Sequence, residues 1–256
     1  MKVLIKIGGS LLDDPAQRSA VAAQIAALSG NIAVVHGGGK QMTRYLDERG
    51  VESRFVNGLR VTTPETVDAV LKVFAGTVNT QLVAALGVAG SKAVGLTGID
   101  AGLAMATQLN PELGFVGRVT SSDPRLLDVL TSAGYLPVVA CVAGGSGGEV
   151  FNVNGDSMAV ACASAWQADR LLFLTDVDGV LDSNKQLLPV LTPADCASLI
   201  ATGVASGGMQ AKLNAATDAV AGGVREVRIV RGSAENVIAR VFAGEQLGTA
   251  IVKDRN

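Results

Sequence analysis

Two lysines and one aspartate have sequence surroundings that suit chemistry on an anion. Lys6 lies in an apolar run directly before Gly8-Gly9, Lys212 follows Gly207-Gly208, and Asp156 lies close to a predicted helix start. Such residues often have ordinary roles, because a strand lysine snorkels or pairs with an acid and a first-turn aspartate caps its helix. The functional alternative for Lys6 is an ammonium group directed at phosphates that the following glycine loop holds.

Glycines gather after the predicted strands. Gly8-Gly9 follows the first strand and Gly37-Gly38-Gly39 follows the second. A glycine turn between a strand and a helix lets backbone N–H groups approach an anion. Tight turns alone would explain one cluster, but several clusters at carboxyl ends of strands favour phosphate or carboxylate binding. Neither standard phosphate motif fits, because Val34 and Met42 stand where a Walker loop and a dinucleotide motif need glycine.

Two further segments carry charged residues with alternative interpretations. Arg60 precedes a predicted helix and could hold a carboxylate bidentately or lie in solvent. The segment Asp176-Val-Asp178-Gly matches the nucleophile loop of haloacid-dehalogenase-type phosphatases, in which Asp176 would attack phosphorus and Asp178 would act as acid and base. That class also needs a later acidic pair for magnesium. No adjacent acidic pair follows Asp182, so this is the less favoured interpretation.

A parallel sheet is the element that would bring these residues together. Continuous apolar runs, typical of strands covered on both faces, predict strands at residues 3–7, 32–36, 136–142, 171–175 and 227–230. Capping residues followed by proline predict helix starts at Asp14-Pro15, Thr63-Pro64, Asp123-Pro124 and Thr192-Pro193. Residues 103–121, interrupted by Asn110-Pro111, predict hairpins. Alternating strands and helices indicate the α/β class.

The composition excludes several classes of protein. The chain has 256 residues and 31 glycines, but no Gly-x-y period, so it is not a collagen. Hydrophobic residues make up 48%, too many for a disordered chain, and the net charge of −2 gives no surplus for nucleic-acid binding. The uncharged runs 73–91 and 129–148 contain too many polar residues for a membrane span, and no signal peptide is visible.

Cysteine and histidine usage limits the redox and metal chemistry. Cys141, Cys162 and Cys196 form no C-x-x-C pair, which predicts reduced, mostly buried thiols and a cytoplasmic protein. A catalytic thiol is the less favoured alternative. His36 is the single histidine, so a metal site with several histidine ligands is excluded.

Taken together, the chain resembles the amino acid kinase family over nearly its whole length. The Asn57-Gly-Leu-Arg-Val-Thr segment indicates the acetylglutamate branch rather than the uridylate or carbamate branches. Each segment is weak alone, but their shared order and spacing are specific. The other segments are Lys6-Ile-Gly-Gly, His36-Gly-Gly-Gly, Gly95-Leu-Thr-Gly-Ile-Asp, Gly114-Phe-Val-Gly, Asn152-Val-Asn-Gly-Asp, Thr175-Asp-Val-Asp-Gly-Val-Leu and Gly208-Met-Gln-Ala-Lys.

The resemblance implies a fold and an activity. The fold is an open three-layer αβα sandwich with a mainly parallel central sheet and hairpins in its N-terminal lobe. Residues 1–256 would form one domain, with an acceptor-binding and dimerising lobe at 1–168 and a nucleotide-binding lobe at 169–256. The activity is ATP-dependent phosphorylation of the side-chain carboxylate of N-acetyl-L-glutamate, the second step of arginine biosynthesis. The alternatives are another acidic acceptor, such as acetylaminoadipate, and a non-catalytic nucleotide-binding regulator.

The resemblance also implies roles for individual residues. Lys6 and Lys212 would stabilise the transferring phosphoryl group, and Asp156 would hold both lysines. Backbone N–H groups for the γ-phosphate and the acceptor carboxylate would come from Gly8, Gly9, Gly38 and Gly39, and the acetylated amino acid would be bound by Arg60 and Asn152. Magnesium-ATP, bound mainly through its phosphates and without a protein metal site, would lie against Asp176, Val177, Asp178, Gly179, Val180, Leu181, Val204, Ala205 and Ser206.

Some positions depart from the family pattern. Lys40 follows the triple glycine where many relatives have proline, Ile99 stands where many have lysine, and Gly155 stands where alanine is common. The first predicted strand has no helix ahead of it. In this family that helix accompanies hexamers inhibited by arginine, so the resemblance implies a homodimer with weak or no arginine inhibition.

Overall fold

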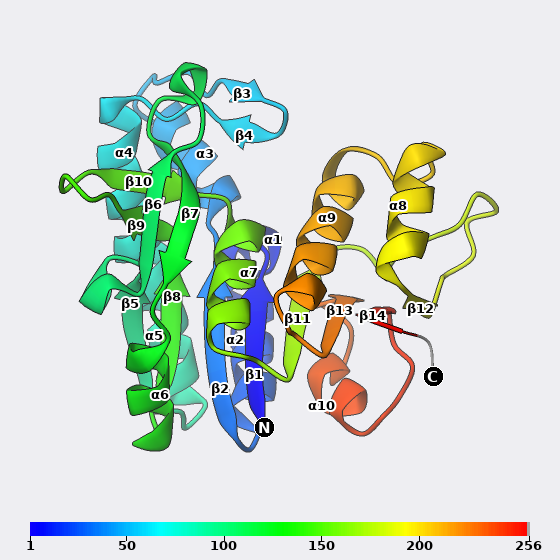
Figure 1. The fold of residues 1–256 in the computed structure, drawn as a ribbon. Helices are drawn as coiled ribbons and strands as arrows, with labels where there is room; N and C mark the ends of the chain where they lie inside the picture. The colour runs from blue at the N-terminus through cyan, green and yellow to red at the C-terminus, as the bar shows by residue number, and fades with distance from the viewer. Residues whose placement is uncertain (255–256) are drawn as a thin grey trace.

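An eight-stranded sheet forms the centre of the computed structural model, which describes residues 1–254 (Figure 1). The strand order is β12-β14-β13-β11-β1-β2-β8-β5, and only the β13–β14 pair is antiparallel. The predicted α/β class is therefore confirmed. The strands are β1 (Lys2–Ile7), β2 (Asn31–His36), β5 (Ala93–Thr97), β8 (Leu136–Ala140), β11 (Arg170–Thr175), β12 (Val190–Leu191), β13 (Glu226–Arg231) and β14 (Thr249–Val252).

Helices cover both faces of this sheet, which completes the three layers (Figure 1). Helices α6, α7, α8 and α9 lie on one face, and α2, α5 and α10 lie on the other. The helices are α1 (Gly9–Asp13), α2 (Pro15–Ala26), α3 (Gly39–Asp47), α4 (Pro64–Val70), α5 (Asn79–Val88), α6 (Arg125–Ser132), α7 (Gly155–Ala165), α8 (Pro193–Ala201), α9 (Gly207–Ala221) and α10 (Val237–Phe242), with a π-helix η1 (Leu71–Val78) and short 3₁₀ turns at Asp100–Gly102 and Pro111–Leu113.

Three of the four predicted helix starts have the expected caps. The side chains of Asp14, Thr63 and Thr192 each accept a backbone N–H from the first turn of the helix that follows. The fourth start is displaced by one residue, because α6 begins at Arg125. Asp123 Oδ1 still accepts the Arg125 N–H at 3.0 Å, so the aspartate satisfies the same helix end from one position further out.

A small closed barrel stands on the N-terminal part of the sheet. It consists of β6 (Ala104–Gln108), β7 (Val116–Ser122), β9 (Val142–Gly144) and β10 (Val150–Val153). The predicted hairpin is confirmed, since β6 and β7 pair antiparallel. The strand predicted at 136–142 was too long, because the chain leaves the main sheet after Ala140 and enters the barrel at Val142. A second hairpin joins β3 (Phe55–Val56) to β4 (Leu59–Arg60).

One helical stretch in residues 1–254, Pro64–Val88, is long and apolar enough to cross a membrane by length and composition alone. It consists of α4, η1 and α5 in succession. Val70, Leu82 and Leu86 on this stretch are fully buried within the core of the fold. The packing therefore accounts for its apolar character as a core helix.

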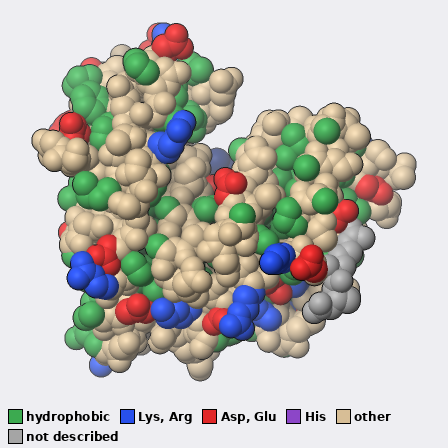
Figure 2. Space-filling model, viewed as in Figure 1, with side chains coloured by type: hydrophobic (Ala, Val, Ile, Leu, Met, Phe, Trp, Pro, Cys, Tyr) green, Lys and Arg blue, Asp and Glu red, His purple; other side chains and the backbone are tan. Residues whose placement is uncertain are grey.

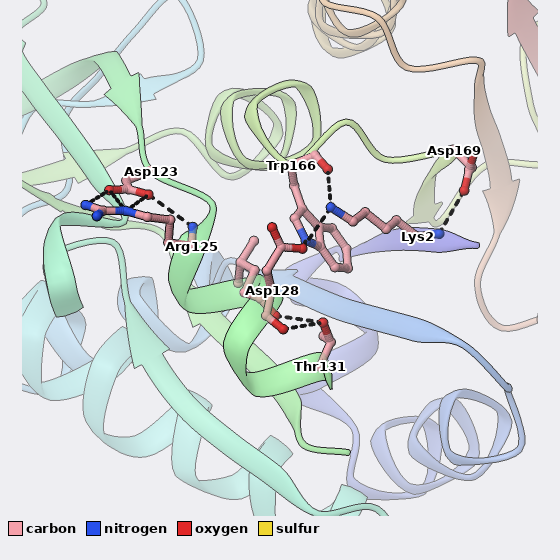
Figure 3. A network of polar contacts seen from close by, with 8 residues as sticks. Lys2, Asp123, Arg125, Asp128, Thr131, Trp166 and Asp169 are labelled. Atoms are coloured by element: carbon pink, nitrogen blue, oxygen red, sulfur yellow. Dashed lines mark hydrogen bonds and ion pairs between the residues drawn. The ribbon is translucent and has the colours of Figure 1, made fainter. Parts of the chain in front are cut away.

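A polar network fastens the amino-terminal end of β1 (Figure 3). Lys2 Nζ lies 2.8 Å from Asp128 Oδ1 and donates to the carbonyl oxygen of Trp166 at 3.2 Å. The buried Trp166 donates its Nε1–H to the same carboxylate at 2.8 Å. The hydrogen bond from Lys2 is the main reason that the pKa of Asp128 lies below its usual value. The network joins β1 to α6 and to the end of α7.

Replacing Asp128 by alanine is expected to lower the free energy of unfolding by about 1–3 kcal/mol, because the buried indole N–H of Trp166 loses its acceptor. Asp128→Asn keeps an acceptor and should lose less. Because the pKa of Asp128 is lowered in the fold, the difference between wild type and Asp128→Asn should be present above about pH 4 and vanish as the pH falls further. Urea unfolding over this pH range measures it, and equal stability of all three proteins would contradict it.

Candidate functional site

The parallel register brings three loops to one edge of the sheet. Ile7 in β1 pairs with His36 in β2 and with Leu174 in β11, so the segments after these strands emerge side by side. In open α/β sheets, ligands bind at this carboxyl edge. The space-filling view shows a hollow between the part that carries the β3–β4 hairpin and the part that carries α8 and α9 (Figure 2).

Most of the predicted catalytic and phosphate-binding residues line one cavity at this edge. Its volume is about 200 Å³, and its lining includes Lys6, Gly8, Gly9, Ser10, Asp156, Thr175, Asp176 and Lys212. A larger groove of about 970 Å³ lies elsewhere, between α8, α9 and β14, and contains none of the predicted residues. Convergent charge, and not size, identifies the smaller cavity as the candidate site.

The two lysines are held by one carboxylate. Lys6 Nζ lies 2.7 Å from Asp156 Oδ1, and Lys212 Nζ lies 3.4 Å from Asp156 Oδ2. Each carboxylate oxygen therefore faces a different ammonium group, from β1 on one side and from α9 on the other. We call this arrangement the lysine clamp, made of Lys6, Asp156 and Lys212.

The surroundings of Asp156 keep the carboxylate ionised. Burial disfavours the charge, but the charges and hydrogen bonds of Lys6 and Lys212 outweigh it, so the pKa of Asp156 lies below its usual value. Asp156 also lies in the first turn of α7, where the helix dipole favours an anion. The Asn154 side chain caps that turn by accepting the Asp156 N–H at 2.9 Å. The clamp carries two positive charges and one negative charge, which leaves it attractive to a further anion.

Two glycine loops meet beside the clamp. A Cβ atom placed on Gly9 would lie 3.1 Å from the backbone nitrogen of Gly39, so the two loops approach as closely as glycine allows. Within residues 1–254, the N–H groups of Gly9, Gly38 and Gly39 have no hydrogen-bond acceptor. The N–H of Gly8, in contrast, donates to the carbonyl oxygen of Leu174 at 3.1 Å. The prediction for this loop is therefore corrected: Gly9, and not Gly8, has an N–H group available for a phosphate.

Arg60 is a buried cation without an acidic partner in the described chain. Arg60 is only 8% exposed. Burial lowers the pKa of its guanidinium, and the charge of Asp47 partly offsets this lowering. It donates to Ser53 Oγ, to Thr43 Oγ1 at 2.7 Å and to the carbonyl oxygen of Gly39 at 3.3 Å. Neutral acceptors orient the group but leave its charge uncompensated, which suits a site for a carboxylate.

Asn152 reaches the same region through a residue that the sequence did not single out. Its Nδ2 donates to Thr62 Oγ1 at 3.0 Å, and that hydroxyl donates to the carbonyl oxygen of Arg60 at 2.9 Å. Thr62 is fully buried and also bridges to Gly114. The threonine of the Arg60-Val-Thr segment was visible in the sequence, but its contact with β10 depends on the barrel.

The predicted nucleotide segments lie on the C-terminal side of the cleft. Thr175 Oγ1 donates to Asp176, whose pKa is lowered by this bond and by the charges of Lys212 and Lys40. The Asp178 carboxylate pairs with Arg231 at 2.5 and 3.0 Å, so it is less free than its sequence suggested.

Of the remaining residues in these segments, two have exposed apolar side chains and two are buried. Leu181 and Val204 are 43% and 37% exposed, respectively. The side chains of Val180 and Ala205 are buried, so they can support these loops but cannot contact a nucleotide.

The described residues support neither a thiol nucleophile nor a metal site built from protein ligands alone. All three cysteines are free and buried, as predicted, and burial raises the pKa of both Cys141 and Cys162 to about 12. These thiols are therefore not nucleophiles near neutral pH. In residues 1–254, no group of three or more histidine, cysteine, aspartate or glutamate side chains is arranged to hold a metal ion.

The family departures lie at or near the cleft. Lys40 is exposed at the second position of α3, and its charge reaches Asp176. A Cβ atom on Gly155 would lie 3.3 Å from Lys6 Cε, so glycine leaves room beside this lysine. Ile99 is partly exposed and removes a cation from the loop that follows β5.

Fold and site define an α/β protein whose cleft gathers groups that suit anions: two lysines, a buried arginine and backbone N–H groups without an acceptor in residues 1–254. The chain belongs to the amino acid kinase family, whose model matches residues 1–231. This membership also leaves the phosphatase interpretation of Asp176 and Asp178 without support.

Relatives and solved structures agree with that assignment. A protein named acetylglutamate kinase from Solibacter usitatus is 60% identical over 98% of this chain and 99% of its own length, and one from Acidobacterium capsulatum is 44% identical over 96% of this chain and 99% of its own length. A structure of N-acetylglutamate synthase from Neisseria gonorrhoeae, complexed with coenzyme A and N-acetyl-glutamate, matches with a TM-score of 0.88 and 25% identity. That match covers 100% of this chain but only 60% of the synthase chain. Carbamate kinase from Giardia lamblia, at a TM-score of 0.75 and 16% identity over 99% of this chain and 98% of its own length, shares the fold.

Proposed function

We propose that this chain transfers the γ-phosphoryl group of ATP to the side-chain carboxylate of N-acetyl-L-glutamate, the second step of arginine biosynthesis. The observation that carries the proposal is the lysine clamp beside the N–H groups of Gly9 and Gly39, which have no acceptor within residues 1–254. The relatives named acetylglutamate kinase support the choice of acceptor.

The chemistry needs charge stabilisation and no base. The acceptor carboxylate is already an anion near neutral pH, so no proton has to be removed before it attacks the γ-phosphorus. The obstacle is repulsion between two anions. Lys6 and Lys212 offset this repulsion and stabilise the transferring group, while Gly9 and Gly39 N–H groups orient it. A new bond joins the carboxylate oxygen to phosphorus, and the bond from phosphorus to the β,γ-bridging oxygen breaks as ADP leaves.

Arg60 and Asn152 bind the acceptor in this proposal. The buried guanidinium of Arg60 would pair with the second carboxylate of acetylglutamate, and the Asn152 side chain would reach its amide group. Thr62 connects the two and keeps their spacing.

The nucleotide would lie against residues that the second half of the chain supplies. Leu181 and Val204 offer exposed apolar surface for the base, and the loop from Asp176 to Gly179 would follow the ribose and phosphates. Magnesium would enter as magnesium-ATP. The donor set fits an ion held through phosphate oxygens and water, since Asp176 is the one carboxylate in the described lining of the cavity apart from Asp156, which is engaged in the clamp.

Arg60→Ala is expected to raise the KM for N-acetylglutamate by on the order of 10-fold or more, with a smaller effect on the KM for ATP, because a charge-assisted pair to the acceptor is lost. Initial rates at varied concentrations of each substrate measure it. Arg54→Ala removes a nearby arginine outside this contact set and serves as the control. An unchanged KM for the acceptor would remove Arg60 from the site.

A panel of acceptors assayed for ADP release, with the acyl phosphate trapped by hydroxylamine, tests the proposed function. N-acetyl-L-glutamate should be phosphorylated, and acetylaminoadipate, glutamate and acetylaspartate should react far more slowly. Preference for acetylaminoadipate would change the acceptor. Nucleotide binding with no ADP release on any acceptor would instead indicate a regulatory protein.

We also propose a lobed, homodimeric and cytoplasmic enzyme. Residues 1–168 would bind the acceptor and form the dimer, and residues 169–256 would bind the nucleotide. Val88 at the end of α5, which packs on the edge strand β5, and Val129 in α6, which packs on the neighbouring β8, are both exposed and support a contact between copies there. Free, buried cysteines support a reducing compartment. Sedimentation analysis tests the oligomeric state.

A further inference from the structure

His36 stands directly before the triple glycine, and the mechanism above does not use it. Its side chain is fully buried at 0% exposure, yet both ring nitrogens have polar partners. Nδ1 lies 2.9 Å from the carbonyl oxygen of Gly37, and Nε2 lies 2.9 Å from Nδ2 of Asn79, a residue that is itself only 5% exposed. A buried polar pair so close to the site requires an explanation.

The partners determine which ring nitrogen carries the proton. A carbonyl oxygen only accepts hydrogen bonds, so His36 Nδ1 must donate to Gly37. Asn79 Nδ2 also lies 2.9 Å from the carbonyl oxygen of Val138, which identifies that atom as the amide nitrogen. Nε2 of His36 therefore accepts from Asn79 and bears no proton. Burial is the main cause that lowers the pKa of His36 to about 4, so the ring is neutral near pH 7.

This bond determines the direction of the next peptide group. The carbonyl group of Gly37 and the N–H group of Gly38 belong to one trans peptide unit and point in opposite directions. When His36 holds the carbonyl, the Gly38 N–H must face away from the histidine. A Cβ atom on Gly155 would lie 3.9 Å from Gly37 Cα and 3.3 Å from Lys6 Cε, so this peptide borders the lysine clamp.

The π-helix η1 supports the same peptide from behind. A Cβ atom on Gly38 would lie 2.8 Å from Phe74 Cδ1 and 3.2 Å from Val78 Cγ2, both in η1. Asn79 is the residue that follows η1. One helical face therefore packs against Gly38 and also carries the anchor of His36. π-helical turns are rare and are frequently found at functional sites.

We propose that His36 and Asn79 form a positioning pair, which holds the Gly37–Gly38 peptide so that the Gly38 N–H points at the reacting anions. The inference rests on the proposed function, because it assigns the target of that N–H. Neither residue touches the substrate in this proposal. Their effect is on the alignment of a donor, which must be within a fraction of an ångström to act.

Two variants disturb the pair in different ways. Asn79→Ala removes the anchor of His36. Gly95→Ala adds a Cβ atom that would lie 2.1 Å from Asn79 Oδ1, so it displaces the Asn79 amide without replacing His36 or Asn79. Both are expected to lower kcat with N-acetylglutamate by on the order of 10²-fold, while the calorimetric Kd for ATP changes little. The split between kcat and nucleotide binding separates loss of alignment from loss of folded protein.

Leu86→Ala is the matched control, because Leu86 is a fully buried residue of α5 that lies about two helical turns beyond Asn79. It should lower Tm at least as much as Asn79→Ala and keep kcat close to wild type. If the control variant lost as much kcat as Asn79→Ala, the inference would be overturned, and Asn79 would have a packing role only. A wild-type chain that phosphorylates no acceptor would instead overturn the proposed function.

The tautomer gives a test that needs no variant. Because His36 is the single histidine of the chain, its ring nitrogens give an unambiguous ¹⁵N spectrum. We expect the neutral Nδ1–H form at pH 7, persisting to about pH 5. A spectrum of the Nε2–H form, or of a charged ring at pH 7, would overturn the inference even if both variants proved unable to fold.

Discussion

Removing the Lys6 ammonium should lower kcat by on the order of 10²-fold or more, because a charge that offsets the repulsion between two anions is lost at the point of transfer. Lys6→Met is the sharper variant, since it keeps most of the apolar stem between the buried Ile5 and Ile7 and removes only the charge. Lys212→Ala should have a similar effect from the opposite side of the cavity. Single-turnover rates with saturating ATP and acetylglutamate measure the loss.

The same strand supplies a control for this prediction. Lys2 lies at the other end of β1 and also pairs with an aspartate, Asp128, at 2.8 Å. Lys2→Ala therefore removes the same residue type and the same kind of ion pair from one strand, but far from the carboxyl edge. It should lower stability and leave kcat unchanged. If Lys6→Met and Lys212→Ala both retained near-normal turnover, the proposed mechanism would be wrong.

Local signals in the sequence identified much of the fold. Helix caps were predictable because each depends on two or three neighbouring residues, as at Asp14, Thr63 and Thr192. Buried strands were predictable because continuous apolar runs suit a sheet covered on both faces. The one-residue error at Asp123 and the overlong strand at 136–142 arise where tertiary context decides where an element begins or ends.

The sequence could predict which residues gather in the candidate site, but it could not predict their hydrogen bonds. The motif resemblance named the clamp residues and Arg60, whereas the loss of the Gly8 N–H to Leu174 depends on pairing with a distant strand. Likewise, Thr62 joins Arg60 to Asn152 only because the barrel places β10 beside it. The π-helix has no sequence signature of its own, so the packing of its residues Phe74 and Val78 against Gly38 was not predictable.

Asp156→Asn should lower kcat by on the order of 10²-fold without weakening ATP binding. The amide keeps the shape of the carboxylate but not its charge, so Lys6 and Lys212 lose the anion that holds both in position. At the same time the cavity gains a net positive charge, which favours a polyanion in the ground state. Turnover and nucleotide affinity should therefore move separately, as rates and calorimetric Kd values can show.

The pH dependence follows from the same carboxylate. The pKa of Asp156 lies below its usual value in the fold, so its contribution to stability is present above about pH 4 and is lost only as the pH falls through the lowered pKa. From pH 5 to pH 8 the ratio of wild-type to Asp156→Asn turnover should thus be constant. Asp128→Asn, which changes the Lys2 pair at the far end of β1, is the control and should keep full turnover. Normal turnover of Asp156→Asn would mean that the two lysines need no shared anion. The clamp would then be a feature of the resting enzyme alone.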